Sequence, residues 1–406
     1  MKESLAVLLA GGAGERLHPL TQNRAKPAVY FGGIYRIIDF TLSNCINSDL
    51  RRIFILTQYK SLSLERHLRL GWGLMSGELG EFIEVLSPQK RVSENWYLGT
   101  ADAVYQNLYS IRRLKPHNVF VLSGDHIYKM DYSLMLEHHR NLNADVTIAA
   151  IEFPLAEAGR FGILDVNSNQ IVTGFQEKPE HPTPLAPGSD LAFVNMGVYL
   201  FNYEVLIDEL MRDAHDDRSA HDFGRNIIPS LLGRYKIAMY NFRDENKKEA
   251  KYWRDIGTID AYYEANMDLV SVDPFFNLYD PAWPLRTYQL QYPPAKFVFA
   301  DEGVRMGVAL DSIVSQGCII SGGRVLNSIL CPNVRINSYS TVDRSILMPG
   351  VNIGRYSQIR KAIIDRSVQI PERTIIGFDP DADAARFTRT PGGITIVASD
   401  GDIQNQ

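Results

Sequence analysis

Cysteine, net charge and long apolar runs are all scarce in this 406-residue chain. The three cysteines, Cys45, Cys318 and Cys331, are odd in number and lie far apart without a CxxC pair, which argues against a disulfide framework or a cysteine metal site. A reducing, cytoplasmic compartment therefore fits best. A formal net charge of -5 gives no overall attraction to nucleic acid or to an anionic membrane, so we expect neither as a partner.

The apolar segments are too short to cross a membrane or to direct export. The sequence has no run of ~18 apolar residues, so no transmembrane helix is expected. The apolar segment 5–10 is shorter than a secretory h-region and ends in glycines, which predicts a first β-strand instead. What is present, 45% hydrophobic and 22% charged residues, is typical of a globular protein, and the length favours two domains.

Short apolar runs alternate with longer helix-like stretches up to about residue 271. This alternation is typical of parallel strands with helical crossovers. The clearest strand candidates are 4–9, 53–56, 119–122 and 146–150. The five prolines of segment 272–299 break any long helix or central strand. We therefore predict an α/β domain over 1–271, a surface linker over 272–299 and a separate domain over 300–406.

Apolar residues recur every six positions in the C-terminal part of the chain. A hexapeptide repeat predicts a parallel β-helix, in which short strands stack coil on coil and bury aliphatic side chains inside. Gly, Asn, Ser and Pro between the aliphatic positions favour the turns that such coils need, although an antiparallel sandwich would also fit the spacing. The residues expected to face the interior are Ile313, Ile319, Val325, Ile346, Ile364, Ile370 and Ile376.

A glycine-rich loop directly follows the first predicted strand. Gly11, Gly12 and Gly14 let the backbone approach a ligand closely and turn its N–H groups toward phosphate oxygens. Arg16 adds a cation to the loop, and Lys26 follows ~10 residues later. The spacing is neither a Walker A loop nor GxGxxG, and alone such a loop is more often a tight turn. The second basic element favours a binding site for nucleotide phosphates.

The loop motif GGAGERL, followed by RAKPAV, FGG, RIIDF and LSNC, resembles the bacterial ADP-glucose pyrophosphorylases, or glucose-1-phosphate adenylyltransferases. Further matching segments are LTQYKS at 56–61, WYLGTADA at 96–103, SGDHIY at 123–128, EKP at 177–179, SAHDFG at 219–224, YWRDIGT at 252–258 and PPAKF at 293–297. The resemblance covers nearly the whole chain. It implies a Rossmann-like nucleotidyltransferase domain with a mostly parallel sheet, followed by a left-handed parallel β-helix that serves oligomerisation and allosteric control.

The same resemblance implies the reaction. The adenylyl group of ATP would pass to glucose 1-phosphate, giving ADP-glucose and pyrophosphate for glycogen synthesis, with Mg²⁺ as cofactor and a homotetramer as the assembly. The expected mechanism is an in-line displacement in which Arg16 and Lys26 neutralise the leaving pyrophosphate. Because a phosphate nucleophile is already ionised at neutral pH, His126 and His221 are interpreted as structural residues.

Two aspartates are candidates for holding the metal. Asp125 comes just after the apolar run 119–122, at the end of a predicted buried strand where open α/β sheets bind ligands. Mg²⁺ prefers one or two carboxylates with phosphate oxygens and water, and Asp255 follows another strand-like stretch. A lone Gly-Asp pair would more often be a helix N-cap, but the family resemblance favours metal ligation.

A lysine is also placed to hold the sugar phosphate. Lys178 can neutralise the glucose 1-phosphate dianion, and Glu177 can accept hydrogen bonds from sugar hydroxyls. An exposed Glu-Lys-Pro is otherwise an unremarkable turn. By resemblance, the remaining glucose pocket comprises Tyr97, Gly162, Asn195, Asp222, Phe223 and Trp253. Asn195 stands where many members have Ser, and Leu98 replaces a frequent basic residue, which puts the detailed sugar contacts in doubt.

Arginines on both sides of the linker are candidates for anionic effectors. The resemblance implies an effector pocket between the domains, supplied from Arg24, Arg36, Arg355, Arg360, Arg386 and Arg389. Any single one is more often a solvated surface residue. Members activated by fructose 1,6-bisphosphate typically carry cations where this chain has Asn23, Tyr30 and Ala385. We therefore predict activation by fructose 6-phosphate or pyruvate, and inhibition by AMP or phosphate.

Three other functions compete with this interpretation. A pyrophosphorylase that uses UTP or dTTP would need the same phosphate machinery. A non-catalytic regulatory subunit would keep the fold, but this chain retains all the charged residues assigned to the chemistry. A hexapeptide acyltransferase would need a catalytic histidine in the C-terminal domain, and no convincing one is present.

Overall fold

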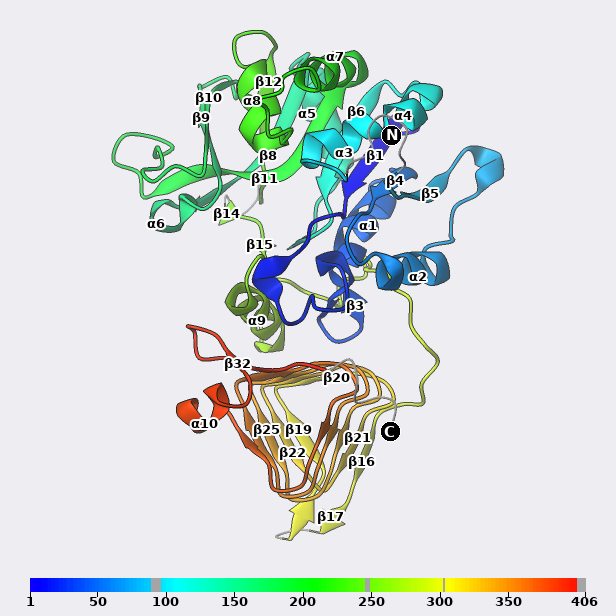
Figure 1. Cartoon of the computed structure of the whole chain (residues 1–406), viewed down its shortest axis with the longest axis vertical. Coiled ribbons are helices and arrows are strands. Elements are labelled where there is room, and N and C mark those ends of the chain that lie inside the picture. Colours follow the sequence, from blue (N-terminus) through cyan, green and yellow to red (C-terminus); the bar gives the residue numbers. More distant parts are fainter. Residues whose placement is uncertain (89–95, 245–248, 302–303, 400–406) are drawn as a thin grey trace.

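A nine-stranded mixed sheet forms the centre of the N-terminal domain in the computed structural model, which describes residues 1–88, 96–244, 249–301 and 304–399 (Figure 1). Its order is β10-β9-β11-β6-β1-β4-β5, and β8 pairs with β11 and β12. The strands are β1 (Ser4–Leu9), β4 (Arg52–Leu56), β5 (Phe82–Leu86), β6 (Asn118–Ser123), β8 (Val146–Pro154), β9 (Gly162–Val166), β10 (Val172–Glu177), β11 (Leu191–Asn202) and β12 (Ile237–Asn241). The β5-β4-β1-β6 half is parallel, and β11 joins β6 antiparallel.

Helices cover both faces of this sheet, because both faces of its central strands are apolar. Leu5 and Val7 of β1 belong to one buried cluster, with α3 (Thr100–Gln106), α4 (Leu108–Leu114), α7 (Tyr203–Asp213) and α8 (Ile228–Leu231). Ala6 and Leu8 belong to the other, with α1 (Ile37–Asn47), α2 (Leu62–Gly71) and α5 (Tyr132–Asn141). Each fully buried leucine contributes about 1.5–3 kcal/mol. The predicted α/β architecture of the N-terminal domain is confirmed.

Short elements complete the domain around the sheet. Two short strand pairs are β2 (Tyr30–Phe31) with β3 (Tyr35–Arg36), and β7 (His126–Tyr128) with β15 (Trp253–Asp255). The others are η1 (Glu15–Leu17), η2 (Lys26–Ala28), η3 (Gly77–Leu79), α6 (Leu155–Ala158), η4 (Phe223–Ile227), β13 (Arg243–Asp244), β14 (Glu249–Ala250), α9 (Ile259–Met267) and η5 (Asp268–Val270). Within the described residues, no helix combines the length and apolar character needed to cross a membrane.

The proline-rich segment is pinned along α1. Trp283 Nε1 donates to Asn44 Oδ1 at 2.9 Å, and the Arg286 backbone N–H donates to Ser43 Oγ at 2.9 Å. Thr287 Oγ1 donates to the buried Asp39 at 2.6 Å. The segment leads into β16 (Lys296–Val298), which already pairs with the β-helix strand β21. The β-helix thus begins four residues before the predicted boundary at residue 300.

The C-terminal domain is a parallel β-helix of three sheets, seen end-on as a triangle in Figure 1. One sheet contains β16, β21 (Ile319–Ser321), β24 (Arg335–Ile336), β27 (Asn352–Ile353) and β30 (Gln369–Ile370). The second contains β19 (Val308–Leu310), β22 (Arg324–Leu326), β25 (Thr341–Asp343), β28 (Gln358–Arg360) and β31 (Ile375–Ile376). The third contains β20 (Ile313–Val314), β23 (Ile329–Leu330), β26 (Ile346–Leu347), β29 (Ala362–Ile364), β33 (Thr395–Val397) and β32 (Thr388–Arg389). The hairpin β17 (Ala300–Asp301) with β18 (Arg305–Met306) and helix α10 (Pro380–Ala384) project from it.

The hexapeptide register was correct for part of the repeat and wrong for the rest. Val325, Ile364, Ile370 and Ile376 belong to the buried core of the β-helix, as expected. Ile319 does not, because it lies in register with Arg335, and its neighbour Ile320 takes the interior position. Adjacent residues of a strand face opposite sides, so a slip of one residue exchanges inside and outside.

Ile313 and Ile346 also fall outside the β-helix core. Both face the cluster that joins the two domains, together with Leu17, Phe31 and Ile259 of the N-terminal domain. The third sheet is apolar on both faces because the N-terminal domain covers its outer one. The spacing alone could not show which aliphatic residue of each adjacent pair points into the β-helix.

Candidate active site

The glycine-rich loop runs from the carboxyl end of β1 into η1 and packs against the segment that carries Lys26. Gly14 has φ +66°, and a Cβ there would lie 3.0 Å from Lys26 Cβ. Thr21 Oγ1 donates to the Gly14 carbonyl at 2.9 Å, which fixes the loop from the same side. A Cβ at Gly11 would lie 3.1 Å from Gln58 Cβ, whereas Gly12 has open space. Two of the three predicted glycines are therefore required by close packing.

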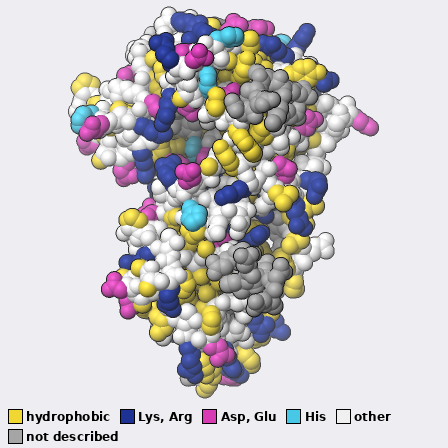
Figure 2. Space-filling model, in the orientation of Figure 1, with side chains coloured by type: hydrophobic (Ala, Val, Ile, Leu, Met, Phe, Trp, Pro, Cys, Tyr) yellow, Lys and Arg dark blue, Asp and Glu magenta, His cyan; other side chains and the backbone are white. Residues whose placement is uncertain are grey.

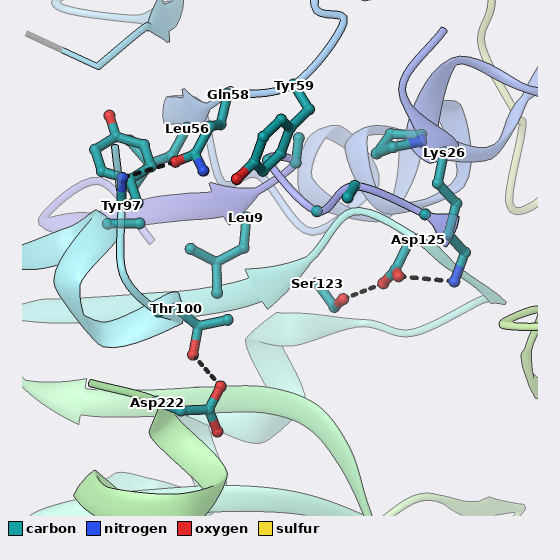
Figure 3. Close-up of a pocket in the computed structure, with 18 of the residues that line it drawn as sticks. Leu9, Lys26, Leu56, Gln58, Tyr59, Tyr97, Thr100, Ser123, Asp125 and Asp222 are labelled. Carbon is teal, nitrogen blue, oxygen red and sulfur yellow. Dashed lines mark hydrogen bonds and ion pairs between the residues drawn. The ribbon is translucent and has the colours of Figure 1, made fainter. Parts of the chain in front are cut away.

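Lys26 lies between two carboxylates at the end of the sheet. Its Nζ is 2.7 Å from Asp125 Oδ2, as Figure 3 shows, and the lysine side chain is only 9% exposed. The same Nζ is 3.6 Å from Asp255 Oδ1. Asp125 follows β6, Asp255 ends β15, and β15 pairs with β7 so that Asp255 lies opposite His126. Three segments distant in the sequence therefore place one ammonium and two carboxylates together.

The surroundings of Asp125 keep it ionised. Burial alone would raise the pKa of this carboxyl, but the charges of Lys26 and His126 oppose that effect. Hydrogen bonds from Lys26 and from Ser123 Oγ act in the same direction, so the pKa of Asp125 lies well below its usual range. The carboxylate is thus negatively charged throughout the neutral pH range.

Arg16 lies near Asp255, on the other side of Gly257. A Cβ at Gly257 would lie 2.9 Å from Arg16 Nη2 and 3.1 Å from both oxygens of Asp255. The Arg16 guanidinium and the Asp255 carboxylate therefore flank this glycine. Arg16 is itself exposed, which leaves its donors accessible to a ligand.

A cavity of about 710 Å³ opens in front of these groups. Of the predicted site residues it is lined by Gly11, Gly12, Gly14, Arg16, Lys26, Tyr97, Asp125 and Asp222. Figure 3 shows Lys26 and Asp125 at one end of the cavity and Tyr97 at the other, with Leu9 between them. A volume of this size is typical of small-molecule sites.

Residues that the sequence interpretation did not assign hold the far end of the cavity. Gln58 Oε1 accepts a hydrogen bond from the Tyr97 backbone N–H at 3.0 Å, and Tyr97 OH accepts one from Asn107 at 2.9 Å. Thr100 Oγ1 donates to Asp222 Oδ2 at 2.9 Å and accepts from the Phe223 N–H at 3.0 Å. Gln58, Thr100 and Ser123 all lie inside matched motifs, and that was the available signal.

Glu177, the last residue of β10, lies beside Gly162 and Gly224. Its Oε2 would lie 2.7 Å from a Cβ at Gly224 and 3.1 Å from a Cβ at Gly162. Gly224 directly follows Phe223, whose ring stacks on Tyr199 with centroids 5.6 Å apart. A Cβ at Gly162 would come closest to the Phe175 ring, at 2.6 Å, and Asp222 and Glu177 lie close together around Gly224.

Six predicted sugar ligands do not line this cavity: Gly162, Glu177, Lys178, Asn195, Phe223 and Trp253. Lys178 is 57% exposed, has φ +48° and lies 3.3 Å from Glu177, so its ammonium is available to a ligand. The side-chain amide of Asn195 is already engaged, since it donates to Tyr199 OH at 2.8 Å and accepts from the Gly197 N–H at 2.9 Å. Trp253 is buried and packs edge-on against His126 and Phe161. Asn195 is therefore placed as a support for Tyr199.

The predicted effector arginines do not form one group. Arg24 is 3% exposed, and its guanidinium is paired with Asp365 in this structure. Its guanidinium cannot bind an anion while this pairing is intact. Arg36 is half-buried over the Tyr30 ring at 4.9 Å and donates to the Ala28 carbonyl and to Ser63.

The other effector candidates lie on the β-helix and are exposed: Arg355, Arg360, Arg386 and Arg389. Arg386 donates to the Ile375 carbonyl at 3.0 Å and lies 3.5 Å from Asp383. The loop after Arg389 reaches the N-terminal domain, where Thr390 Oγ1 donates to Asp260 of α9 at 2.7 Å. On the face shown in Figure 2, basic and acidic side chains are interspersed over both domains.

Asp125 and Asp255 are suited to a hard divalent cation. The described residues contain no group of three or more histidine, cysteine, aspartate or glutamate side chains that could hold a metal by themselves. The two carboxylates nevertheless converge on a single cation, the Lys26 ammonium. Two carboxylates completed by phosphate oxygens and water are the ligands that Mg²⁺ favours. The donor set fits Mg²⁺ delivered with a nucleotide.

Comparisons with known proteins agree with this division of the chain. A family model described as "Nucleotidyl transferase" matches residues 5–272, and one described as "GlmU-like, C-terminal hexapeptide" matches residues 293–397. A protein of Koribacter versatilis named glucose-1-phosphate adenylyltransferase is 62% identical, over 98% of this chain and 96% of its own. Proteins with the same name from Rhodopirellula baltica and Methylococcus capsulatus are 53% and 51% identical, over 98% of this chain and 90% and 94% of theirs.

Proposed function

Because the chain belongs to the glucose-1-phosphate adenylyltransferase family of nucleotidyl transferases, we propose that it transfers the adenylyl group of ATP to glucose 1-phosphate. The products are ADP-glucose, the activated glucose for glycogen synthesis, and pyrophosphate. The observation that carries this proposal is the Lys26 ammonium held between Asp125 and Asp255 beside the glycine-rich loop.

The loop and its two cations bind the triphosphate. Gly12 lines the cavity with open space beside it, so the loop backbone is accessible to phosphate oxygens. Arg16 and Lys26, which also line the cavity, add positive charge near Asp255. As pyrophosphate leaves, its growing negative charge is neutralised by Arg16 and Lys26. Catalysis then consists of positioning and electrostatic stabilisation, without a covalent intermediate on the protein.

Asp125 and Asp255 are the residues that would hold Mg²⁺. When bound, the ion supplies Lewis-acid polarisation and charge neutralisation at the transferring phosphate. The lowered pKa of Asp125 keeps this ligand ionised at neutral pH without any further base.

The sugar side of the site is supplied by β10 and the loop before η4. Lys178 meets the dianionic phosphate of glucose 1-phosphate as an exposed cation, and Glu177 and Asp222 offer carboxylates to sugar hydroxyls. Phe223 and Tyr199 form the apolar wall behind them. A phosphate oxygen of the sugar then attacks the α-phosphorus, and no histidine is needed as a base.

A pyrophosphate-release assay with glucose 1-phosphate and each nucleoside triphosphate tests this function. We expect ATP to support turnover far better than UTP or dTTP, and release to depend on added Mg²⁺. Faster turnover with UTP or dTTP would assign the chain to a different nucleotide specificity. Acetyl-CoA should not be consumed.

We also propose that the active form is a homotetramer controlled by anionic effectors. The β-helix has open ends and aliphatic edges, which closed symmetric assemblies commonly cover. The exposed β-helix arginines and the half-buried Arg36 offer cations on both sides of α9. Light scattering that showed a stable, active monomer would contradict the assembly.

A further inference from the structure

A buried ion pair joins the two domains close to the active site. Arg24 Nη2 donates to both carboxylate oxygens of Asp365 at 2.8 Å, and both side chains are 4% exposed. Asp365 follows β29 on the β-helix face that packs against the N-terminal domain. Ser399 Oγ and the Arg366 N–H donate to the same carboxylate, so its orientation is fixed from the β-helix side.

Arg24 is separated from Lys26 by a single residue. The intervening Ala25 donates its N–H to the Lys60 carbonyl at 3.3 Å, and its carbonyl accepts from the Ala28 N–H, which begins η2. Lys26 packs beside Gly14, where an added Cβ would lie only 3.0 Å from the Lys26 Cβ. Any shift of Arg24 must therefore displace the backbone that aims the Lys26 ammonium at Asp125.

We propose that Asp365 of the β-helix acts through Arg24 as a positioning residue for Lys26. In this role the pair holds the catalytic domain and the β-helix in the relative position at which Lys26 contacts both carboxylates and the nucleotide phosphates. The inference rests on the proposed function for its catalytic meaning, but the contact itself lies outside the cavity. It assigns to Arg24 a mechanical role at the boundary between the two domains.

The chemistry of the pair explains how it would fix the position of one domain relative to the other. A buried bidentate pair is satisfied at one geometry only, and separating its partners leaves an uncompensated charge away from water. Replacing both partners by apolar residues of similar size is often neutral for stability. The effect of the pair on protein stability can therefore be separated by experiment from its effect on the relative position of the domains.

The decisive variant is the double substitution Arg24→Met with Asp365→Leu. It removes both charges and retains apolar packing next to Met348, which lies 3.7 Å from Arg24 Nη1. We expect an unchanged melting temperature within a few degrees, a fall in kcat of at least tenfold, and little change in KM for glucose 1-phosphate. Arg24→Lys keeps the charge but loses the two-pronged contact, and we expect it to show the same loss of kcat.

A double-mutant cycle separates positioning from general damage. In a Lys26→Ala background the Arg24→Met/Asp365→Leu change should lower kcat no further, because the group that it positions is gone. Glu209→Gln is the matched control, since Glu209 is fully buried and ion-paired with Arg212 in α7, away from Lys26. The effect of Glu209→Gln on kcat should be additive with that of Lys26→Ala.

Hydrogen exchange gives a readout that does not depend on the proposed reaction. Peptides covering residues 24–29 should exchange faster in the Arg24→Met/Asp365→Leu protein than in the wild type, and unchanged in Glu209→Gln. Any of three results would overturn the proposal. These are a wild-type kcat in both Arg24 variants, an effect on kcat that is additive with that of Lys26→Ala, and unchanged hydrogen exchange at residues 24–29. If the wild type released no pyrophosphate from ATP and glucose 1-phosphate, the proposed function would fail, and exchange at 24–29 would still decide the coupling.

Discussion

Asp125 anchors Lys26 at the residue scale, and it is also one of the two carboxylates proposed to hold a divalent cation. We expect Asp125→Asn to lower kcat by ~100-fold or more while the protein stays folded, because the amide supplies no charge at the transferring phosphate. The check is kcat from pyrophosphate release, with circular dichroism to establish the fold. Near-normal turnover would remove Asp125 from the mechanism.

The same residue sets a pH dependence. Its folded-state pKa is lowered from the ordinary 3.8, so its carboxylate stabilises the folded protein above that pH, and the contribution is lost as pH falls further. Acid unfolding of Asp125→Asn should therefore be less steep than that of the wild type below about pH 4.

Lys178 should behave differently from Asp125. It is 57% exposed with Glu177 as its ion-pair partner, so its removal should barely change stability. Loss of a charge-assisted contact of ~1.5–3 kcal/mol predicts that Lys178→Ala raises KM for glucose 1-phosphate by ~10- to 100-fold. KM for ATP should change far less. Equal increases for both substrates would assign Lys178 to the nucleotide.

Prediction from sequence succeeded best for residues that follow strands. The glycine-rich loop and Asp125 lie close because they follow the parallel neighbours β1 and β6, which the pattern of apolar runs already indicated. Lys26 then contacts Asp125 from η2. The roles of Asn195 and Arg24 could not be predicted, because each depends on a partner, Tyr199 or Asp365, that only the folded chain brings near.

At the scale of elements, a buried carboxylate is one of the groups that hold the proline-rich segment. Asp39 is fully buried and accepts hydrogen bonds from His67, Trp72 and Thr287, so it joins α1, α2 and the segment before β16. Thr287→Val keeps the shape of the side chain and removes one donor. We expect it to lower the free energy of unfolding by about 1–3 kcal/mol.

Chemical denaturation measures this change, and Thr258→Val offers a comparison. Thr258 caps α9 by accepting from the Ala261 N–H at 3.2 Å, so its loss should cost about 1 kcal/mol. A Thr287→Val protein as stable as the wild type would show that Asp39 does not depend on the segment.

The β-helix shows what a repeat can and cannot specify. Its spacing predicted the coil, but the strands are two or three residues long and carry adjacent aliphatic residues such as Ile346 and Leu347. One of the pair packs inside the coil and the other against the N-terminal domain. Only the second domain decides which isoleucines are buried at the interface, and no local pattern contains that information.

At the scale of the whole molecule, α9 lies between the two sets of exposed or half-buried arginines. Its Asp260 accepts from Thr390 beside Arg389, and its Tyr262 donates to the Tyr30 carbonyl beneath Arg36. An anion bound by arginines from both sides would tighten the contact of the β-helix with α9, and the Arg24–Asp365 pair lies at the same boundary. Effector binding and Lys26 would then be linked through one interface.

This boundary carries few free cations for a doubly phosphorylated effector. Asn23, Tyr30 and Ala385 supply no charge, Arg24 is already paired with Asp365, and the Tyr30 ring is covered by Arg36. Each missing charge-assisted contact weakens binding by ~1.5–3 kcal/mol, and the affinity for a bisphosphate falls more than the affinity for a monophosphate. We expect fructose 6-phosphate or pyruvate to activate at lower concentration than fructose 1,6-bisphosphate, with AMP or phosphate inhibiting. Activation assays at subsaturating substrate measure this order, and Ala385→Arg should shift it toward the bisphosphate. Strong, selective activation of the unmodified enzyme by micromolar fructose 1,6-bisphosphate would show that these positions do not set effector choice.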